Sequence, residues 1–193
     1  DAIDHLFNHP NVGPFIGKQL IQRLVKSNPT PAYISRVAAA FNDNGSGERG
    51  DMKAVVKAIL MDEEARDCAW MQHESNGKLR EPLLRYTHIS RAIEIDQANG
   101  RFWNLGYNFL ENTGQGILAA PNVFNFFLPY YQPNGPIADA GLIAPEFQIH
   151  NSRTSIGYMN AAFYWTRYDA LMDNWVENDP YVQLDYYKLE PLA

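Results

Sequence analysis

The chain has 193 residues, of which 46% are hydrophobic and 13% aromatic, and this is enough for one domain with a sizeable core. Its net charge of −6 lies wholly in residues 102–193, because acidic and basic residues balance over residues 1–101. An acidic, aromatic second half argues against a nucleic-acid partner, which needs a basic face, and against an anionic membrane surface. No apolar run approaches the roughly 20 residues of a membrane span. Cys68 is the single cysteine, which excludes an internal disulfide framework and a multi-cysteine metal site.

Helical periodicity dominates the first hundred residues. Between Pro14 and Lys26, Ile16, Leu20 and Leu24 recur at spacings of four residues. Start signals, either an N-cap residue or a proline in the first turn, precede three further apolar repeats. These signals are Thr30-Pro31 before a helix to about Phe41, Asp51 before a helix to about Leu60, and Glu81-Pro82 before a helix to about Ile95.

The second half predicts one more long helix. Pro145-Glu146 begins an amphipathic stretch that extends to about Trp175, whereas residues 96–150 are mostly irregular and the tail 176–193 is acidic and aromatic. We therefore predict an all-α fold, an irregular helical bundle with a long, non-helical arm rich in proline and aromatic residues. A single helical domain spans 1–175. The residues expected on the inner face of the last helix are Ile156, Met159, Ala162 and Phe163.

The arm carries the candidate binding residues. Prolines at 121, 129 and 133 forbid a long helix, and the aromatic side chains between them are too many to leave in water. As structure, Phe124 and Phe127 lie one helical turn apart and would anchor in the core, while Phe126 meets another element or a partner. As a site, the aromatic rings would stack on a sugar or an extended ligand. The candidate ligand- or partner-binding residues are Trp103, Phe124, Phe126, Phe127, Tyr130 and Tyr131.

Two patterns have metal-ligand character. His5 and His9 have the i, i+4 spacing of helical ligands, although His9-Pro10 is equally typical of a helix end with surface or capping imidazoles. The polar loop 42–51 offers oxygen ligands for Ca²⁺, but the twelfth position counted from Asn42 is Lys53, not the Glu that a calcium loop needs. We predict a glycine-rich structural turn and no metal or cofactor. The residual metal candidates are Asp43, Asp51, His5 and His9.

Other reactive residues have weaker signals. Lys78 and Arg80 would bind an anion at a helix start, or would form a salt-bridged helix N-terminus with Glu81 and Arg85. Cys68 follows four acidic residues, which disfavour a thiolate, and is expected to be a small core residue. Ser152 and Ser155 follow His150, but nearness in sequence is not a triad and no G-x-S-x-G elbow exists.

Four segments together resemble a known family. They are F-N-H-P-N-V-G-P-F-I-G-K-Q-L-I-Q-R-L-V at 7–25, F-N-D-N-G-S-G-E-R-G-D-M-K-A-V-V-K-A-I-L at 41–60, G-K-L-R-E-P-L-L-R at 77–85 and G-Q-G-I-L-A-A-P-N-V-F-N-F-F at 114–127. In this order they resemble the C-terminal part of a large bacterial family, domain of unknown function 1800. The match covers roughly residues 1–165.

The resemblance implies a mostly helical exported protein, periplasmic or extracellular, often encoded beside another exported protein of unknown function. It brings no activity, cofactor or catalytic residue. Because the long N-terminal portion of the family is missing, we expect a fragment whose Phe7, Phe15 and Leu24 face a surface that another chain or segment covers.

The expected function is a non-enzymatic scaffold or binding protein that acts with the remainder of its own polypeptide or with a protein partner. The alternative is an exported hydrolase acting on a polymer, with its catalytic residues mostly in the missing portion. Whether the protein is an enzyme stays open.

Overall fold

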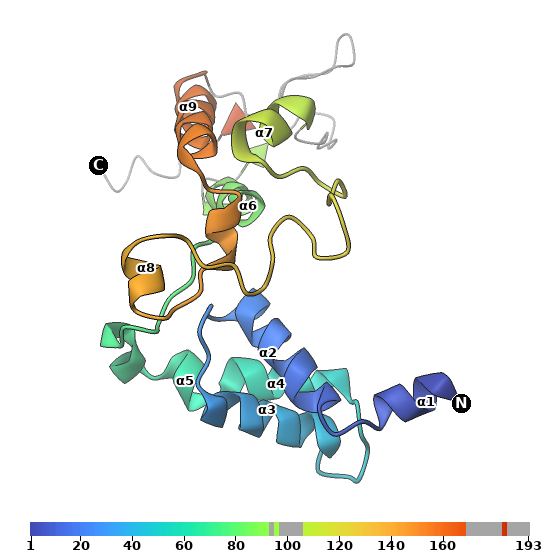
Figure 1. The fold of residues 1–193 in the computed structure, drawn as a ribbon. Coiled ribbons are helices and arrows are strands. Elements are labelled where there is room, and N and C mark those ends of the chain that lie inside the picture. The colour runs from blue at the N-terminus through green and yellow to red at the C-terminus, as the bar shows by residue number, and fades with distance from the viewer. Residues whose placement is uncertain (93–94, 97–105, 169–182, 185–193) are drawn as a thin grey trace. The chain divides into compact units, whose positions relative to one another are not determined.

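The structure is a computed structural model that describes residues 1–92, 95–96, 106–168 and 183–184 (Figure 1). The predicted all-α class is confirmed. In the described residues the exceptions are an isolated bridge between Asn122 and Asn125 and one antiparallel pair of two-residue strands, β1 (Ile95–Asp96) and β2 (Gln183–Leu184), with Ile95 opposite Leu184. Ile95, expected at the end of a helix, therefore lies in a strand. Trp103 lies outside the described residues.

The chain divides into two compact units. Unit 1 comprises Asp1–Lys78 and Pro129–Pro145, and unit 2 comprises Leu79–Leu128 and Glu146–Ala193. The single domain predicted over 1–175 stays a prediction, and each unit is described by itself. The helices within unit 1 are α1 (Ala2–Phe7), α2 (Val12–Leu24), α3 (Pro31–Asn42), α4 (Met52–Met61), α5 (Glu63–Arg66), η1 (Cys68–Gln72) and α8 (Pro136–Asp139). Unit 2 has α6 (Pro82–Ala92), α7 (Gly106–Thr113) and α9 (Ser152–Tyr168), while η2 (Pro145–Gln148) begins at the unit boundary.

Helices α2, α3 and α4 form the core of unit 1 (Figure 1). Glycines on α2 let α3 approach closely, since a Cβ atom on Gly17 would lie only 3.0 Å from the Val37 side chain. The helix starts follow the predicted caps: Thr30 Oγ1 accepts the Tyr33 N–H, and Asp51 accepts two N–H groups of α4. The buried residues that pack together in this core are Ile21, Tyr33, Val37, Phe41, Val55 and Ile59.

Helix α1 has no buried residue and is held mainly at its C-terminal end. Arg49 donates to the carbonyls of Phe7 and His9, and the Phe7 ring packs 5.9 Å from the Phe41 ring. Gly50, at φ +83°, makes room for the Phe7 ring, because a Cβ atom would lie 2.6 Å from it. Phe7 is thus partly packed although still exposed, whereas Phe15 and Leu24 are exposed.

Unit 2 is built around three aromatic rings from α6, α7 and α9. The Tyr86 ring meets the Phe109 and Trp165 rings edge-on, at centroid distances of 5.7 and 5.0 Å. Gly157 brings α9 against α7, because a Cβ atom there would overlap the Asn112 carbonyl. Burial raises the pKa of Tyr86 to about 12.

The predicted inner face of α9 is wrong except at Ala162. Ile156, Met159 and Phe163 are exposed, and Trp165 is buried instead. The helix is apolar on both sides, so periodicity alone does not distinguish its faces. Gly157 permits the close approach of α9 to α7, and this determines which face of α9 is buried. The helix also begins at Ser152, after the separate turn η2, and not at Pro145. Residues 169–175 of the predicted helix lie outside the described ones.

Candidate functional site

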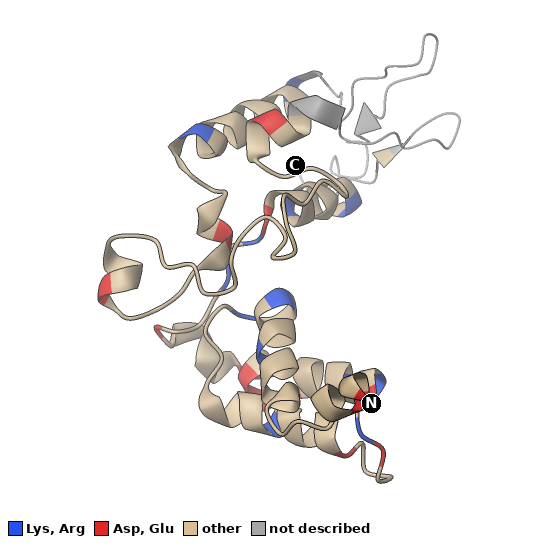
Figure 2. Cartoon of the chain, turned by 45° about the vertical axis from the view of Figure 1, so that its right-hand side comes forward, with Lys and Arg blue, Asp and Glu red and all other residues tan. Residues whose placement is uncertain are grey.

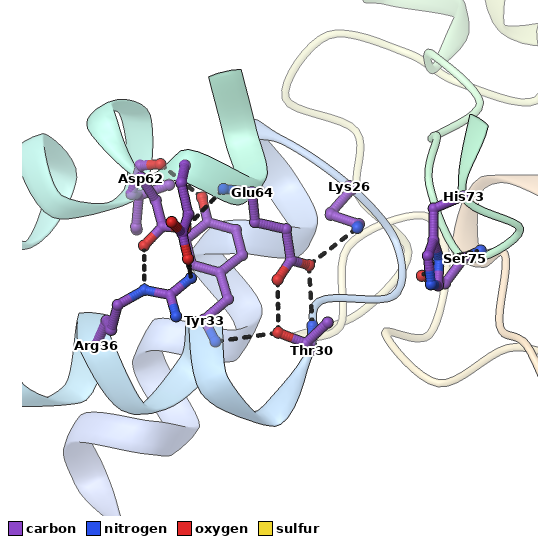
Figure 3. Close-up of polar contacts among 10 residues, drawn as sticks. Lys26, Thr30, Tyr33, Arg36, Asp62, Glu64, His73 and Ser75 are labelled. Carbon is purple, nitrogen blue, oxygen red and sulfur yellow. Dashed lines mark hydrogen bonds and ion pairs between the residues drawn. The ribbon is translucent and has the colours of Figure 1, made fainter. Parts of the chain in front are cut away.

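Two deeply buried charges, Lys26 and Glu64, form one polar network in unit 1 (Figure 3). Lys26 Nζ lies 2.9 Å from Glu64 Oε1, and both side chains are 1% exposed. Thr30 donates to the same carboxylate twice, from its backbone N–H at 3.0 Å and from its hydroxyl at 2.5 Å. Lys26 Nζ also lies 4.8 Å from the centre of the Trp70 ring. The network joins the end of α2, the start of α3 and α5.

The chemistry of this network is structural. Burial by itself would raise the pKa of Glu64, but the hydrogen bonds from Thr30 and Lys26 outweigh it and hold the pKa below its ordinary value. Glu64 is therefore ionised at neutral pH, and its oxygens are occupied by donors within the fold. A carboxylate in this state has no proton to give and no free face for a substrate.

Arg36 and Asp62 form a second, more exposed pair beside the network (Figure 3). Both Arg36–Asp62 hydrogen bonds are 2.7 Å long, and Asp62 also accepts the Glu64 N–H as the cap of α5. Tyr33 donates to the Ile59 carbonyl at 2.5 Å, and burial raises the pKa of its hydroxyl. These contacts connect α3 with the end of α4.

The 42–51 loop folds around its own polar side chains. Asp43 Oδ1 accepts the N–H groups of Gly45 and Gly47, at 2.8 and 2.9 Å, and Asn44 donates to Asp51 at 2.9 Å. These bonds lower the pKa values of both carboxylates, through Gly47 foremost for Asp43 and through Asn44 foremost for Asp51. The predicted structural role of this loop agrees with these contacts, while calcium binding itself stays to be measured.

His5 and His9 do not share a helical face, so that part of the metal interpretation is wrong. Helix α1 ends at Phe7, and His9 Nδ1 accepts the Asn11 N–H at 3.2 Å beyond it. Within the described ranges, no three His, Cys, Asp or Glu residues are arranged to hold a metal ion.

The candidate anion-binding residues fall in different units, so their common site stays a prediction. Lys78 belongs to unit 1 and Arg80 to unit 2, where Arg80 Nη1 lies 2.8 Å from His88 Nδ1. The start of α6 is held by Gln115, which accepts the Leu83 N–H and donates to Glu81. Sequence reasoning missed Gln115, since it is 32 residues from Leu83 and belongs to no local capping pattern.

The imidazole of His150 contacts a serine, as the nearness in sequence allowed. Ser155 Oγ lies 3.2 Å from His150 Nε2, and Arg85 Nη2 lies 3.5 Å from His150 Nδ1. Because Arg85 can only donate, Nδ1 must be the acceptor and Nε2 carries the proton of the neutral ring. His150 then donates to Ser155 and does not act as its base. Arg85 stands where a Ser-His-Asp triad has its carboxylate, so these residues do not have the arrangement of that triad.

The aromatic candidates are divided between the two units. Phe127 is 3% exposed but is not among the residues of the two hydrophobic cores, so its anchoring in the core stays a prediction, whereas Phe124 is 52% exposed and its predicted anchoring is wrong. Phe126 is half-buried in the same unit. Tyr130, exposed, and Tyr131, half-buried, belong to unit 1. The structure therefore does not describe one common aromatic surface.

The reason for the exposure of Phe124 is a tight turn at Asn122–Asn125. The Asn125 N–H donates to the Asn122 carbonyl at 3.1 Å, and the Phe124 N–H donates to Asn122 Oδ1 at 2.8 Å. Asn125 takes φ +69°, which asparagine tolerates. Val123 and Phe124 occupy the two central positions, and Val123 is 94% exposed. Leu118 precedes this turn at φ +56°, with its side chain fully exposed.

Charged residues are sparse in the sequence around this turn, and the segment from α7 to η2 is accordingly drawn almost entirely in tan (Figure 2). Between residues 114 and 145 the sequence has a single charged residue, Asp139. The polar clusters described above stabilise the fold, and the turn displays apolar side chains without a charged neighbour in sequence.

These features define an all-α protein whose described polar clusters are structural and whose conspicuous surface feature is an apolar turn. The chain belongs to the family described as "Protein of unknown function (DUF1800)", whose model matches residues 1–184. No curated protein and no solved structure matches it. None of the helices in the described residues combines the length and the apolar character that a membrane span requires.

Proposed function

We propose that this protein is a non-enzymatic binding or scaffold module, and that the Asn122–Asn125 turn contacts a protein partner. The observation that carries the proposal is the display of Val123 and Phe124 on a backbone fixed by hydrogen bonds. A turn fixed before binding loses little conformational entropy on association, which favours affinity. An aromatic side chain at such a tip is a typical energetic anchor of an interface.

The expected partner surface is an apolar pocket. The turn has no charged residue close in sequence, so it offers neither the basic groups that attract nucleic acid nor those that attract anionic lipid. The proposed partner is another polypeptide or the remainder of this one.

Export to the periplasm or the cell exterior is part of the proposal and rests on the family resemblance. The alternative, a hydrolase, has one observation in its favour, the Ser155–His150 hydrogen bond. The position of Arg85 opposes it, because His150 donates to Ser155. A fluorophosphonate probe distinguishes the two, since it labels only an activated serine. We expect no label on Ser155, and stoichiometric labelling would establish the hydrolase.

Site-specific photo-crosslinking in the native cell tests the binding role. A photoreactive phenylalanine analogue at Val123 is expected to give one discrete adduct with a single polypeptide, identified by mass spectrometry. The same analogue at Ser46, exposed at the tip of a polar loop in unit 1, is the control and is expected to give none. Absence of any adduct at Val123, or the same adducts from both positions, would exclude the turn as a binding surface.

A further inference from the structure

Arg85 is a half-buried cation without an anion. It lies in the first turns of α6, with its guanidinium 4.0 Å from the centre of the Tyr158 ring on α9. Among the described residues, no carboxylate forms an ion pair with it. Its Nε atom is buried and has no hydrogen-bond acceptor. A ring face attracts the cation but leaves the N–H groups of the guanidinium edge unsatisfied.

The contact with the Tyr158 ring offsets part of the cost of burying the Arg85 charge, but it supplies no hydrogen-bond acceptor for the Nε–H group. Burial lowers the pKa of Arg85, yet a guanidinium stays protonated in proteins. The contact to His150 Nδ1 is 3.5 Å, at the outer limit of a hydrogen bond. It is therefore easily exchanged for a better acceptor.

The surroundings of Arg85 are otherwise neutral. His150 approaches from the residues before α9, with the Phe147 ring of η2 edge-on against it at 6.2 Å. Burial and then the Arg85 charge lower the pKa of His150, so the imidazole is neutral at pH 7. Burial likewise raises the pKa of Tyr158, against the effect of Arg85, and keeps its hydroxyl protonated. Ser155 supplies a hydroxyl on the far nitrogen of His150. The cluster thus has a net charge of +1.

We propose that the cluster of Arg85, His150, Ser155 and Tyr158 is a binding site for a carboxylate group. The guanidinium would form two parallel hydrogen bonds with the carboxylate, using the Nε edge that has no partner, after the weak contact with His150 is released. The source is either a small organic acid or an acidic side chain of a polypeptide. This inference stands on unit 2 alone and does not depend on the proposed binding role of the Asn122–Asn125 turn.

The test is a ¹⁵N NMR titration of the arginine Nε–H signals with sodium acetate, at pH 7 and at constant ionic strength set with sodium chloride. The Arg85 Nε–H signal is expected to shift saturably, and the pKa of His150 is expected to rise because an anion has joined the cluster. Arg85→Lys keeps the charge but loses the fork together with its Nε–H signal, so its binding is followed through the His150 imidazole signals and is expected to be weaker by about tenfold. Arg80→Lys is the matched control, because Arg80 is exposed on the same approach to α6, and it is expected to leave binding unchanged.

Two outcomes would overturn the proposal. One is an Arg85 Nε–H signal that does not move up to about 100 mM acetate, which would detect a millimolar Kd. The other is an equal response to chloride or a stronger one to inorganic phosphate. If Arg85→Lys fails to fold, the titration of the wild-type protein decides by itself. A peptide with blocked ends and one glutamate, bound more tightly than acetate, would identify a polypeptide source. Tighter binding of acetate would identify a small acid.

Discussion

Glu64 shows how strongly a single buried residue organises unit 1. Its carboxylate joins Lys26 at the end of α2 to Thr30 at the start of α3, at positions where water does not reach. A buried charge pair of this kind is weak evidence for stability by itself, because desolvation offsets much of the attraction. Removing one partner is strongly destabilising, because the other charge then stays buried without compensation.

We predict that Glu64→Gln lowers the free energy of unfolding by about 3–5 kcal/mol, since Lys26 would keep its charge with only the Trp70 ring and a neutral amide beside it. Urea denaturation followed by circular dichroism measures this. Arg153→Met is the control, because both partners of its pair with Glu111 are exposed, and it should cost no more than about 1 kcal/mol. Equal losses from both variants would show that burial of the network is unimportant.

The pH dependence of stability follows from the same residue. The pKa of Glu64 is lower in the folded protein than in the unfolded chain, so its contribution is complete above the unfolded value of about 4.3 and is lost as the pH falls through the folded value. The difference in unfolding free energy between the wild-type protein and Glu64→Gln should therefore shrink below about pH 4. A difference that grows on acidification would show that folding raises the pKa of Glu64 and does not lower it.

At the scale of elements, the contact between α7 and α9 depends on one small residue. We predict that Gly157→Ala destabilises the protein by about 1–3 kcal/mol or more, because the added methyl group would overlap the backbone of α7, which cannot rotate away. Thermal unfolding monitored by tryptophan fluorescence reports on this through Trp165, which lies in the adjoining core. Asn160→Ala, on the exposed side of the same helix, should leave the midpoint within error or raise it slightly.

The two faces of α9 give a further prediction. Trp165→Ala removes a ring packed against Tyr86 and Phe109 and should cost about 3–5 kcal/mol. Met159→Ala, on the exposed face, should change stability by less than about 0.5 kcal/mol. Chemical denaturation measures both losses. A larger loss for Met159→Ala than for Trp165→Ala would show that the face predicted from the sequence is the buried one.

Helix starts were predictable from the sequence because their causes are local. Thr30-Pro31 and Asp51 satisfy backbone groups within three residues of themselves, so no tertiary knowledge is needed. The face of α9 was not predictable in this way, since it depends on the space at Gly157. The exposure of Phe124 was missed for a similar reason, because the Asn122 side chain and the positive φ of Asn125 turn the backbone outward where helical spacing predicted an anchor.

At the scale of the whole molecule, helical periodicity and helix start signals correctly indicated the class of fold, but the sequence did not indicate the site. The acidic second half and the crowded aromatics predicted a surface for contact without basic residues, and the apolar turn fits that expectation. The Arg85 cluster was hidden, because its members come from segments about 65 residues apart and meet only in the folded unit 2. Neither charge counts nor local motifs report a contact of that kind.

The measurement that tests the binding role most directly is titration calorimetry of this protein with the polypeptide that crosslinks to position 123. We predict that Phe124→Ser weakens the affinity by about 30-fold, the effect of an interface anchor worth 2 kcal/mol, while the melting midpoint stays unchanged. Phe163→Ser removes another exposed ring of unit 2, outside the turn, and should weaken binding much less. An affinity unchanged in Phe124→Ser, or reduced equally by both variants, would contradict the account.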